Sequence, residues 1–182
     1  MNKEQTITGV IRGTGACVPE RILDNDEIAG FVDTSDEWIR ERTGVRKRRI
    51  AEKETTVSMA CEAGRQAVEE AGISPGEIDM ILVATGSPDQ IFPCTACRVQ
   101  EALGADGAVG FDLNAACSGF LFAYNTAQAY IASGIYRTVL VIGSESISRM
   151  VDWTDRGTCI LFGDGAGAAV LRSEEGTGFL PA

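Results

Sequence analysis

Short apolar runs alternate along this chain with stretches whose apolar positions recur every three to four residues. Alternation of this kind indicates an α/β fold in which helices cover both faces of a mixed, mostly parallel sheet. Five strands are predicted in that sheet. They span residues 7–18, 78–84, 108–113, 139–142 and, as a last strand interrupted at 163–165, 159–161 with 166–171.

The predicted helices are bounded by residues that commonly begin or end helices. A short helix over 35–42 has Ser35 as its N-cap, and longer helices are predicted over 55–71, 95–103 and 117–133. A glycine follows the end of each longer segment. In the last helix, positions 120, 121, 124, 127 and 131 share a face that we expect to point into the core.

Composition narrows the class of protein without changing this fold. Of the 182 residues, 45% are hydrophobic and 23% are charged, which is typical of a globular domain and excludes a disordered or collagen-like chain. The apolar runs are far shorter than the ~20 residues of a membrane-spanning helix. Glu4, Gln5 and Arg12 also interrupt any apolar signal segment. We therefore expect a soluble, cytoplasmic protein that does not bind membranes.

Charge is unevenly distributed along the chain. The net charge is −10, which argues against nucleic-acid binding. Residues 40–49 nevertheless hold six Lys and Arg against the single acid Glu41, so this segment is net positive. Two interpretations remain open for it: a solvated surface loop, or a site for phosphate or an anionic partner, since clustered guanidinium groups bind phosphate oxygens.

Cysteine is the residue type that offers a candidate nucleophile. The sequence has six cysteines and no histidine, so Cys–His and Ser–His pairs cannot form within it. Cys117 lies where a predicted strand turns through small residues into a helix. There the helix dipole and free backbone N–H groups favour a thiolate and can hold the oxyanion of an attacked thioester. The alternative is that Cys117 is a small buried hydrophobic residue like the other five.

Two further motifs are weaker. Cys94 and Cys97 form a lone C-x-x-C pair, which lacks the four ligands of a structural zinc site, although a metal or redox role is conceivable. The glycines of residues 163–167 lack the spacing and lysine of a phosphate-binding loop. Tight backbone packing is the better interpretation of those glycines.

Several segments, in this order, carry a family resemblance. They are DTSDEWIRERTGVRKRRI (33–50), Phe92-Pro93, DLNAACSGF (112–120), TDRGT (154–158) and FGDGAGAAVL (162–171). Together they resemble β-ketoacyl-acyl-carrier-protein synthase III, a thiolase-fold condensing enzyme that starts type II fatty-acid synthesis. The resemblance implies acyl-CoA and malonyl-acyl carrier protein as substrates, a homodimer, and neither a resident cofactor nor a metal.

The resemblance also implies roles for individual residues. Cys117 would take the acyl group, and Trp38 and Arg156 would sandwich the adenine of CoA. Arg42 would contact a CoA phosphate, and Thr34 would lie near the adenine. The expected acyl-pocket residues are Gly86, Phe92 (which would reach across the dimer), Ile147 and Phe162.

Only the first half of the family's chain is matched by these residues. The resemblance places the His and Asn of malonyl decarboxylation in a second half, so we expect residues 1–182 to be one thiolase-like half without condensation activity of its own. A rival hypothesis is a non-catalytic fragment that binds CoA or self-associates through the apolar face that its twin half would cover.

Overall fold

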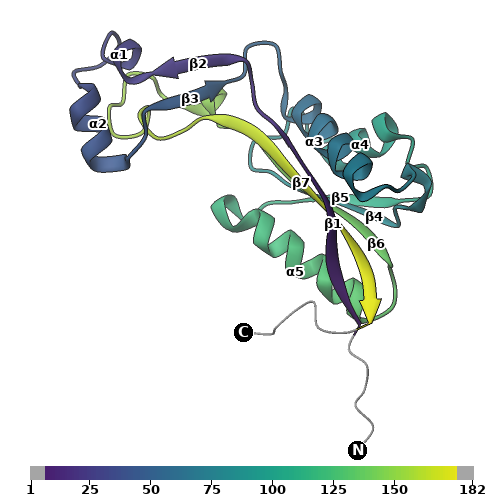
Figure 1. Cartoon of the computed structure of the whole chain (residues 1–182). Coiled ribbons are helices and arrows are strands. Elements are labelled where there is room, and N and C mark those ends of the chain that lie inside the picture. Colours follow the sequence, from purple (N-terminus) through teal and green to yellow (C-terminus); the bar gives the residue numbers. More distant parts are fainter. Residues whose placement is uncertain (1–6, 176–182) are drawn as a thin grey trace, which may run out of the picture.

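A five-stranded sheet forms the body of the molecule in the computed structural model, which describes residues 7–175 (Figure 1). The strands lie in the order β1-β7-β6-β4-β5. Their bounds are β1 (Ile7–Cys17), β4 (Met80–Ala84), β5 (Val109–Leu113), β6 (Thr138–Ser146) and β7 (Asp164–Glu175). All five predicted strands are therefore present in one sheet.

The sheet is mixed and mostly parallel, as predicted, because β1, β6, β4 and β5 run in one direction and β7 alone runs against them. β4 pairs in parallel with both β5 and β6, whereas β7 is antiparallel to both β1 and β6. β7 is reversed because it returns from a long loop at the carboxyl end of β6 and must run back along it. Residues 159–161, predicted as strand, lie instead in a turn of that loop.

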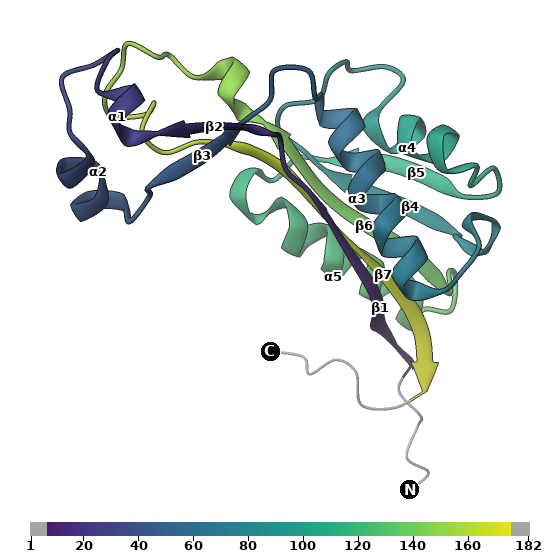
Figure 2. The ribbon, with the colours of Figure 1, turned by 45° about the horizontal axis from the view of Figure 1, so that its top comes forward.

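Helices cover both faces of the sheet (Figure 2). One face packs against α3 (Thr56–Ala71) and α4 (Thr95–Leu103) through apolar residues that include Met59, Val99 and Ile142. The other face packs against α5 (Gly119–Ala132), where Ile131 meets Leu82 and Val141. Each buried strand therefore supplies alternate side chains to two cores, as its continuous apolar sequence requires.

The predicted helix boundaries are confirmed by their caps. Thr55 and Ser58 form a reciprocal capping box at the start of α3. Ser35 accepts a hydrogen bond from the amide of Trp38 at the start of α2 (Asp36–Thr43). Gly72 and Gly104 end α3 and α4 with positive φ angles of 65° and 71°, a conformation that glycine adopts without steric cost.

The exposed face of α5 differs from the prediction. Ala127 and Ile131 are buried and Tyr124 is partly buried, but Phe120 and Leu121 are exposed, Leu121 by 65%. The sheet is covered by the small and apolar residues nearer the carboxyl end of α5. At its amino end, Phe120, Leu121 and Phe122 form an apolar patch on the surface of the described residues.

A small lobe projects from the end of the main sheet, and the sequence pattern did not predict its strands. β2 (Arg21–Asp24) and β3 (Lys47–Ile50) pair antiparallel, with α1 (Asn25–Ile28) and α2 beside them. A third apolar cluster, centred on Leu23, Ile39 and Ile160, fills this lobe. The lobe thus joins residues from the first third of the chain to the loop before β7.

Strand β1 lies so close to α3 that two of its positions exclude any side chain. A Cβ at Gly13 would lie 2.2 Å from the carbonyl oxygen of Ala67, and one at Gly15 would lie 2.0 Å from that of Ala63. These distances are far below van der Waals contact, so glycine sets the depth at which β1 packs. Within residues 7–175, no helix is long and apolar enough to cross a membrane.

Candidate active site

Cys117 lies on the turn that joins β5 to α5, in a short 3₁₀ helix at Ala116–Ser118. Its thiol is exposed, whereas each of the other five cysteines is partly or fully buried. The preceding residue, Ala116, has a φ of 48°. This left-handed conformation is strained for a residue with a side chain, and such strain is often found at functional sites. The predicted strand-to-helix junction at Cys117 is confirmed.

Two contacts hold this turn in place. The side-chain oxygen of Asn114 accepts a hydrogen bond from the amide of Ala116 at 3.2 Å. Gly119 begins α5 so near β4 that an added Cβ would lie 3.1 Å from the side chain of Ala84. The turn is therefore anchored on both sides of Cys117, which leaves the thiol at the surface.

The remaining cysteines have less reactive surroundings. Burial raises the pKa of Cys17, Cys61 and Cys159. Contact with Cys94, together with burial, raises the pKa of Cys97. A raised pKa leaves less of the nucleophilic thiolate at neutral pH. Exposure and position together thus distinguish Cys117 as the candidate nucleophile.

Glu145, at the carboxyl end of β6, organises the loop beside this turn. Its carboxylate accepts hydrogen bonds from the amide of Gly86, at 2.7 Å, and from the hydroxyl of Ser87. The space above Gly86 is bordered by both Glu145 and Asn114, whose side-chain oxygens would each lie 3.6 Å from an added Cβ. Gly86, predicted as an acyl-pocket residue, is therefore placed next to the residue that anchors the Cys117 turn.

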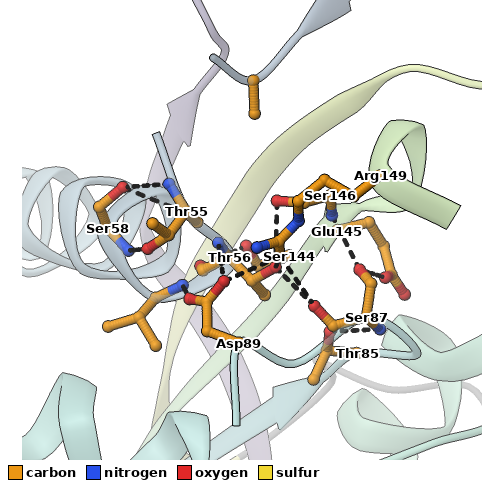
Figure 3. A network of polar contacts seen from close by, with 12 residues as sticks. Thr55, Thr56, Ser58, Thr85, Ser87, Asp89, Ser144, Glu145, Ser146 and Arg149 are labelled. Carbon is orange, nitrogen blue, oxygen red and sulfur yellow. Dashed lines mark hydrogen bonds and ion pairs between the residues drawn. The ribbon is translucent and has the colours of Figure 1, made fainter. Parts of the chain in front are cut away.

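A buried polar network continues from this loop to the start of α3 (Figure 3). The Thr56 hydroxyl donates to the carbonyl of Ser87 at 2.7 Å, and the Ser144 hydroxyl donates to the carbonyl of Thr56 at 2.8 Å. Asp89 accepts from the amide of Val57 at 2.8 Å and pairs with Arg149 at 2.8 Å. Although burial opposes ionisation of Asp89, the Val57 and Arg149 hydrogen bonds lower its pKa.

In the lobe, two arginines lie on one tryptophan. The guanidinium carbons of Arg42 and Arg156 are 4.1 Å and 4.6 Å from the centre of the Trp38 ring. Arg156 also donates to the carbonyl of Asp33 at 3.0 Å. Trp38, Arg42 and Arg156, three of the four predicted CoA-binding residues, are thus in contact, although Trp38 and Arg156 are far apart in sequence. The fourth, Thr34, directly follows Asp33 in the chain.

The spacing of this cluster bears on how a base could bind. Stacked layers lie about 3.5–4 Å apart, so a planar base between indole and guanidinium needs about 7 Å. The 4.6 Å separation leaves no such room, and a base can enter only if Arg156 moves away from the indole. Thr34 has a buried hydroxyl oxygen without a hydrogen-bond partner among the described residues.

The predicted acyl-pocket residues differ in their exposure to solvent. Phe92 is 90% exposed on the loop before α4, and Phe162 is exposed just before β7. Ile147 is partly buried at the end of β6. A cavity of about 410 Å³ near the Cys117 turn is lined by neighbours of Gly86 and Phe92 rather than by these residues themselves. Their pocket role stays a prediction.

The basic segment is not a uniformly solvated loop, because one of its arginines is buried. Arg48 is only 5% exposed and donates to the carbonyl of Ile160, at 2.6 Å and 3.1 Å, and to the side chain of Asn25 at 2.7 Å. Arg40 pairs with Asp36 at 3.2 Å. Arg40 and Arg46 border a cavity of about 450 Å³ that three acidic side chains also line. The segment therefore serves partly to hold the lobe together.

Replacing Arg48 with methionine should lower the free energy of unfolding by about 2–4 kcal/mol, because buried oxygens of Ile160 and Asn25 lose their donor. Urea unfolding followed by tryptophan fluorescence would measure this, since Trp38 and Trp153 both pack in the lobe. The matched control is Lys47→Met, at the exposed neighbouring position, which should cost less than about 0.5 kcal/mol. Equal losses in the two variants would contradict the structural role of Arg48.

The supporting residues Asn114, Glu145 and Arg48 were not predicted from the sequence pattern. Asn114 stands inside the segment that pointed to Cys117, and a polar side chain in that run of small residues was its only signal. Glu145 follows a buried strand, where its charge could have suggested a place beside the site. Arg48 carried no signal, because burial cannot be read from a basic run. The first glycine of the 163–167 motif does pack tightly, with a virtual Cβ 3.1 Å from the carbonyl of Arg49.

Known proteins resemble the chain both in sequence and in structure. Residues 111–182 match the 3-oxoacyl-[acyl-carrier-protein] synthase III family. Two relatives carrying the name β-ketoacyl-[acyl-carrier-protein] synthase III are 52% identical (Clostridium acetobutylicum) and 56% identical (Desulfitobacterium hafniense). The matches cover 94% and 93% of this chain, but 53% and 52% of those relatives.

Solved structures give the same result. The crystal structure of 3-oxoacyl-[acyl-carrier-protein] synthase III from Aquifex aeolicus superposes with a TM-score of 0.91 at 50% identity, over 92% of this chain and 55% of that one. The priming β-ketosynthase of the R1128 polyketide pathway gives 0.90 at 40% identity, over 96% and 52%. The chain spans about half the length of the relatives it matches, and over that length it is similar in sequence and in structure to β-ketoacyl-[acyl-carrier-protein] synthase III proteins.

Proposed function

We propose that this chain supplies the acyl-accepting part of a 3-oxoacyl-[acyl-carrier-protein] synthase III. The Cys117 thiolate attacks the carbonyl carbon of an acyl-CoA thioester, such as acetyl-CoA. A C–S bond to Cys117 forms as the C–S bond to CoA breaks, and the CoA thiolate takes up a proton from solvent. The observation that carries the proposal is the exposed Cys117 thiol on a strained turn at the start of α5.

In the same step, the lobe binds the nucleotide part of acyl-CoA. Trp38, Arg42 and Arg156 offer a flat indole and two guanidinium groups, which suit an adenine ring and the phosphates of CoA. In Figure 1 the lobe projects from the side of the sheet at which β6 ends and β7 begins. β4 and β5 run parallel to β6, so the Cys117 turn lies at that same side. An acyl-CoA held by the lobe therefore extends toward the nucleophile.

The remainder of the reaction belongs to the whole protein. There the acyl-enzyme condenses with malonyl-acyl carrier protein, which loses CO₂ to give the attacking carbanion, with His and Asn residues supplied from outside residues 1–182. No resident cofactor or metal takes part in this scheme. A homodimer in which Phe92 reaches the partner's acyl pocket is part of the proposal, and its 90% exposure supports it. The free cysteines suit a cytoplasmic location.

The test compares two acetyl donors on the natural gene product. One is acetyl-CoA, and the other is acetyl-N-acetylcysteamine, a thioester without the nucleotide. Both should acetylate Cys117, as seen by peptide mass spectrometry. Trp38→Ala should slow transfer from acetyl-CoA about tenfold, the expected effect of losing one base–aromatic stack, and leave transfer from the short thioester unchanged.

Trp153→Ala is the matched control, because it removes the other tryptophan of the lobe, which packs on Phe31 instead of on the arginines. Trp153→Ala should change the rate of acetyl transfer by the same factor for both donors. Circular dichroism would show that each variant is folded. Equal slowing of both donors by Trp38→Ala would contradict the nucleotide-binding role. An unmodified Cys117 in a protein that still binds CoA would instead favour a non-catalytic CoA-binding fragment.

A further inference from the structure

Cys94 and Cys97 lie side by side at the start of α4. Cys94 is the N-cap residue, and Cys97 stands one turn later on the same side of the helix. Their sulfur atoms are 3.4 Å apart, with the Cys94 thiol donating to the Cys97 sulfur. Both side chains are partly buried and both thiols are free. The C-x-x-C spacing therefore produces a true pair of contacting thiols.

The backbone between the two cysteines is fixed by an acidic side chain of β5. Asp112 accepts hydrogen bonds from the amides of Thr95 and Ala96, each at 2.8 Å. A disulfide requires a sulfur–sulfur distance of about 2.05 Å, which side-chain rotation can reach from 3.4 Å. The helix start is thus held in the conformation in which the two sulfurs can join.

A reagent can reach the pair from one side. Cys94 lines the cavity of about 410 Å³ whose wall also includes Gln90, Asp112 and Asn114. Cys97 is not part of that wall. Cys94 is therefore the sulfur that a small molecule reaches first. Cys97 is the neighbouring thiol that can displace that molecule from Cys94.

A metal is a poorer occupant than a disulfide. Two thiols provide half of the four ligands of a structural zinc site. Among residues 7–175, no group of three or more His, Cys, Asp or Glu side chains is placed to hold a metal ion. The chemistry left to the pair is that of a dithiol.

We propose that Cys94 and Cys97 form a redox-reactive dithiol, which small-molecule disulfides such as oxidised glutathione convert to an intrachain disulfide. The Cys94 thiolate attacks one sulfur of oxidised glutathione, forming a mixed disulfide and releasing one glutathione. Cys97 then attacks the Cys94 sulfur, which forms the Cys94–Cys97 bond and releases the second glutathione. The protein loses two electrons and two protons, and the oxidant becomes two thiols.

The environment of Cys97 leaves the first attack to Cys94. Contact with Cys94 and burial raise the pKa of Cys97, so less of it is thiolate at neutral pH, and its part in the second step rests on its 3.4 Å contact with the Cys94 sulfur. Disulfides of this kind in cytosolic proteins are commonly transient and redox-sensing. The proposal does not depend on acyl transfer at Cys117.

The experiment uses the natural gene product with Cys117→Ala, which removes the exposed thiol as a competing site. After treatment with oxidised glutathione and then N-ethylmaleimide, the peptide carrying residues 94 and 97 should be two hydrogens lighter, without alkyl groups. Dithiothreitol should restore both thiols. In the same background, Cys97→Ser leaves Cys94 alone, which should retain a bound glutathione because no neighbour displaces it. Cys94→Ser leaves Cys97 alone, which should react far more slowly with oxidised glutathione because it does not line the cavity.

Cys61→Ser is the matched control, since Cys61 is partly buried on α3 and is not one of the contacting pair. It should leave formation of the Cys94–Cys97 disulfide unchanged. Alkylation of both cysteines after oxidation would overturn the proposal. A stable glutathione adduct on Cys94 in the protein that retains Cys97 would overturn it equally, because it would show that Cys97 cannot reach the Cys94 sulfur.

Discussion

Replacing Cys117 with alanine should abolish acetylation by both acetyl-CoA and acetyl-N-acetylcysteamine. Removal of a nucleophile commonly costs on the order of 10³-fold or more in rate, because no other group can form the covalent intermediate. Here the other cysteines are buried or partly buried, and burial raises the pKa of Cys17, Cys61 and Cys159. Quenched-flow acetylation read by intact-protein mass spectrometry would measure the loss.

Cys61→Ala is the control for that variant, because it removes a half-buried thiol from α3 and replaces it with a good helix former. Its acetylation rate should stay close to that of the unmodified protein. CoA affinity should be unaffected in Cys117→Ala, since the lobe residues are untouched. Persistent acetylation in Cys117→Ala would show that another thiol is the acceptor and would remove the basis of the proposed function.

Replacing Gly15 with alanine should destabilise the fold by about 3 kcal/mol or more. The added Cβ would lie 2.0 Å from the carbonyl oxygen of Ala63 and 2.8 Å from the amide of Ala67, both in the backbone of α3. Backbone atoms cannot rotate away as a flexible side chain can, so β1 and α3 must separate and lose packing. The midpoint of urea unfolding would report the loss.

Gly107→Ala provides the comparison, because a Cβ there meets nothing within 4 Å and Gly107 is not among the residues with positive φ. Its effect on unfolding should stay below about 0.5 kcal/mol. If Gly15→Ala unfolds at the same urea concentration as Gly107→Ala, the close approach of β1 to α3 does not limit stability.

Periodicity predicted the main sheet well because its strands and helices each bury a regular stripe of side chains. The same principle failed at α5, where Phe120 and Leu121 are apolar but remain exposed. It also missed β2 and β3, which are short and rich in charge. The buried side chain of β3 is Arg48, which donates to Ile160 and Asn25, so these strands lack the alternating apolar residues that periodicity detects.

The candidate site was predictable where chemistry is local. Cys117 stands at a junction that the neighbouring residues define, so its position was evident in sequence. The contacts of Glu145 could not be predicted from the sequence. They join Glu145 to Gly86 and Ser87 across 59 and 58 positions, so they depend on how β4 and β6 pair. The meeting of Trp38 with Arg156 followed only from the family resemblance.

The contacts of Arg48 have a consequence for the order in which the chain can fold as it is synthesised. A ribosome makes α1, α2 and both strands of the lobe early, but the carbonyl that Arg48 binds lies 112 residues later, at Ile160. β1 likewise waits for β7 as its partner in the sheet. The nascent chain must therefore carry β1 and Arg48 without these later partners while β4, α4 and β5 assemble locally. The part of the protein that is translated first is among the last to be completed.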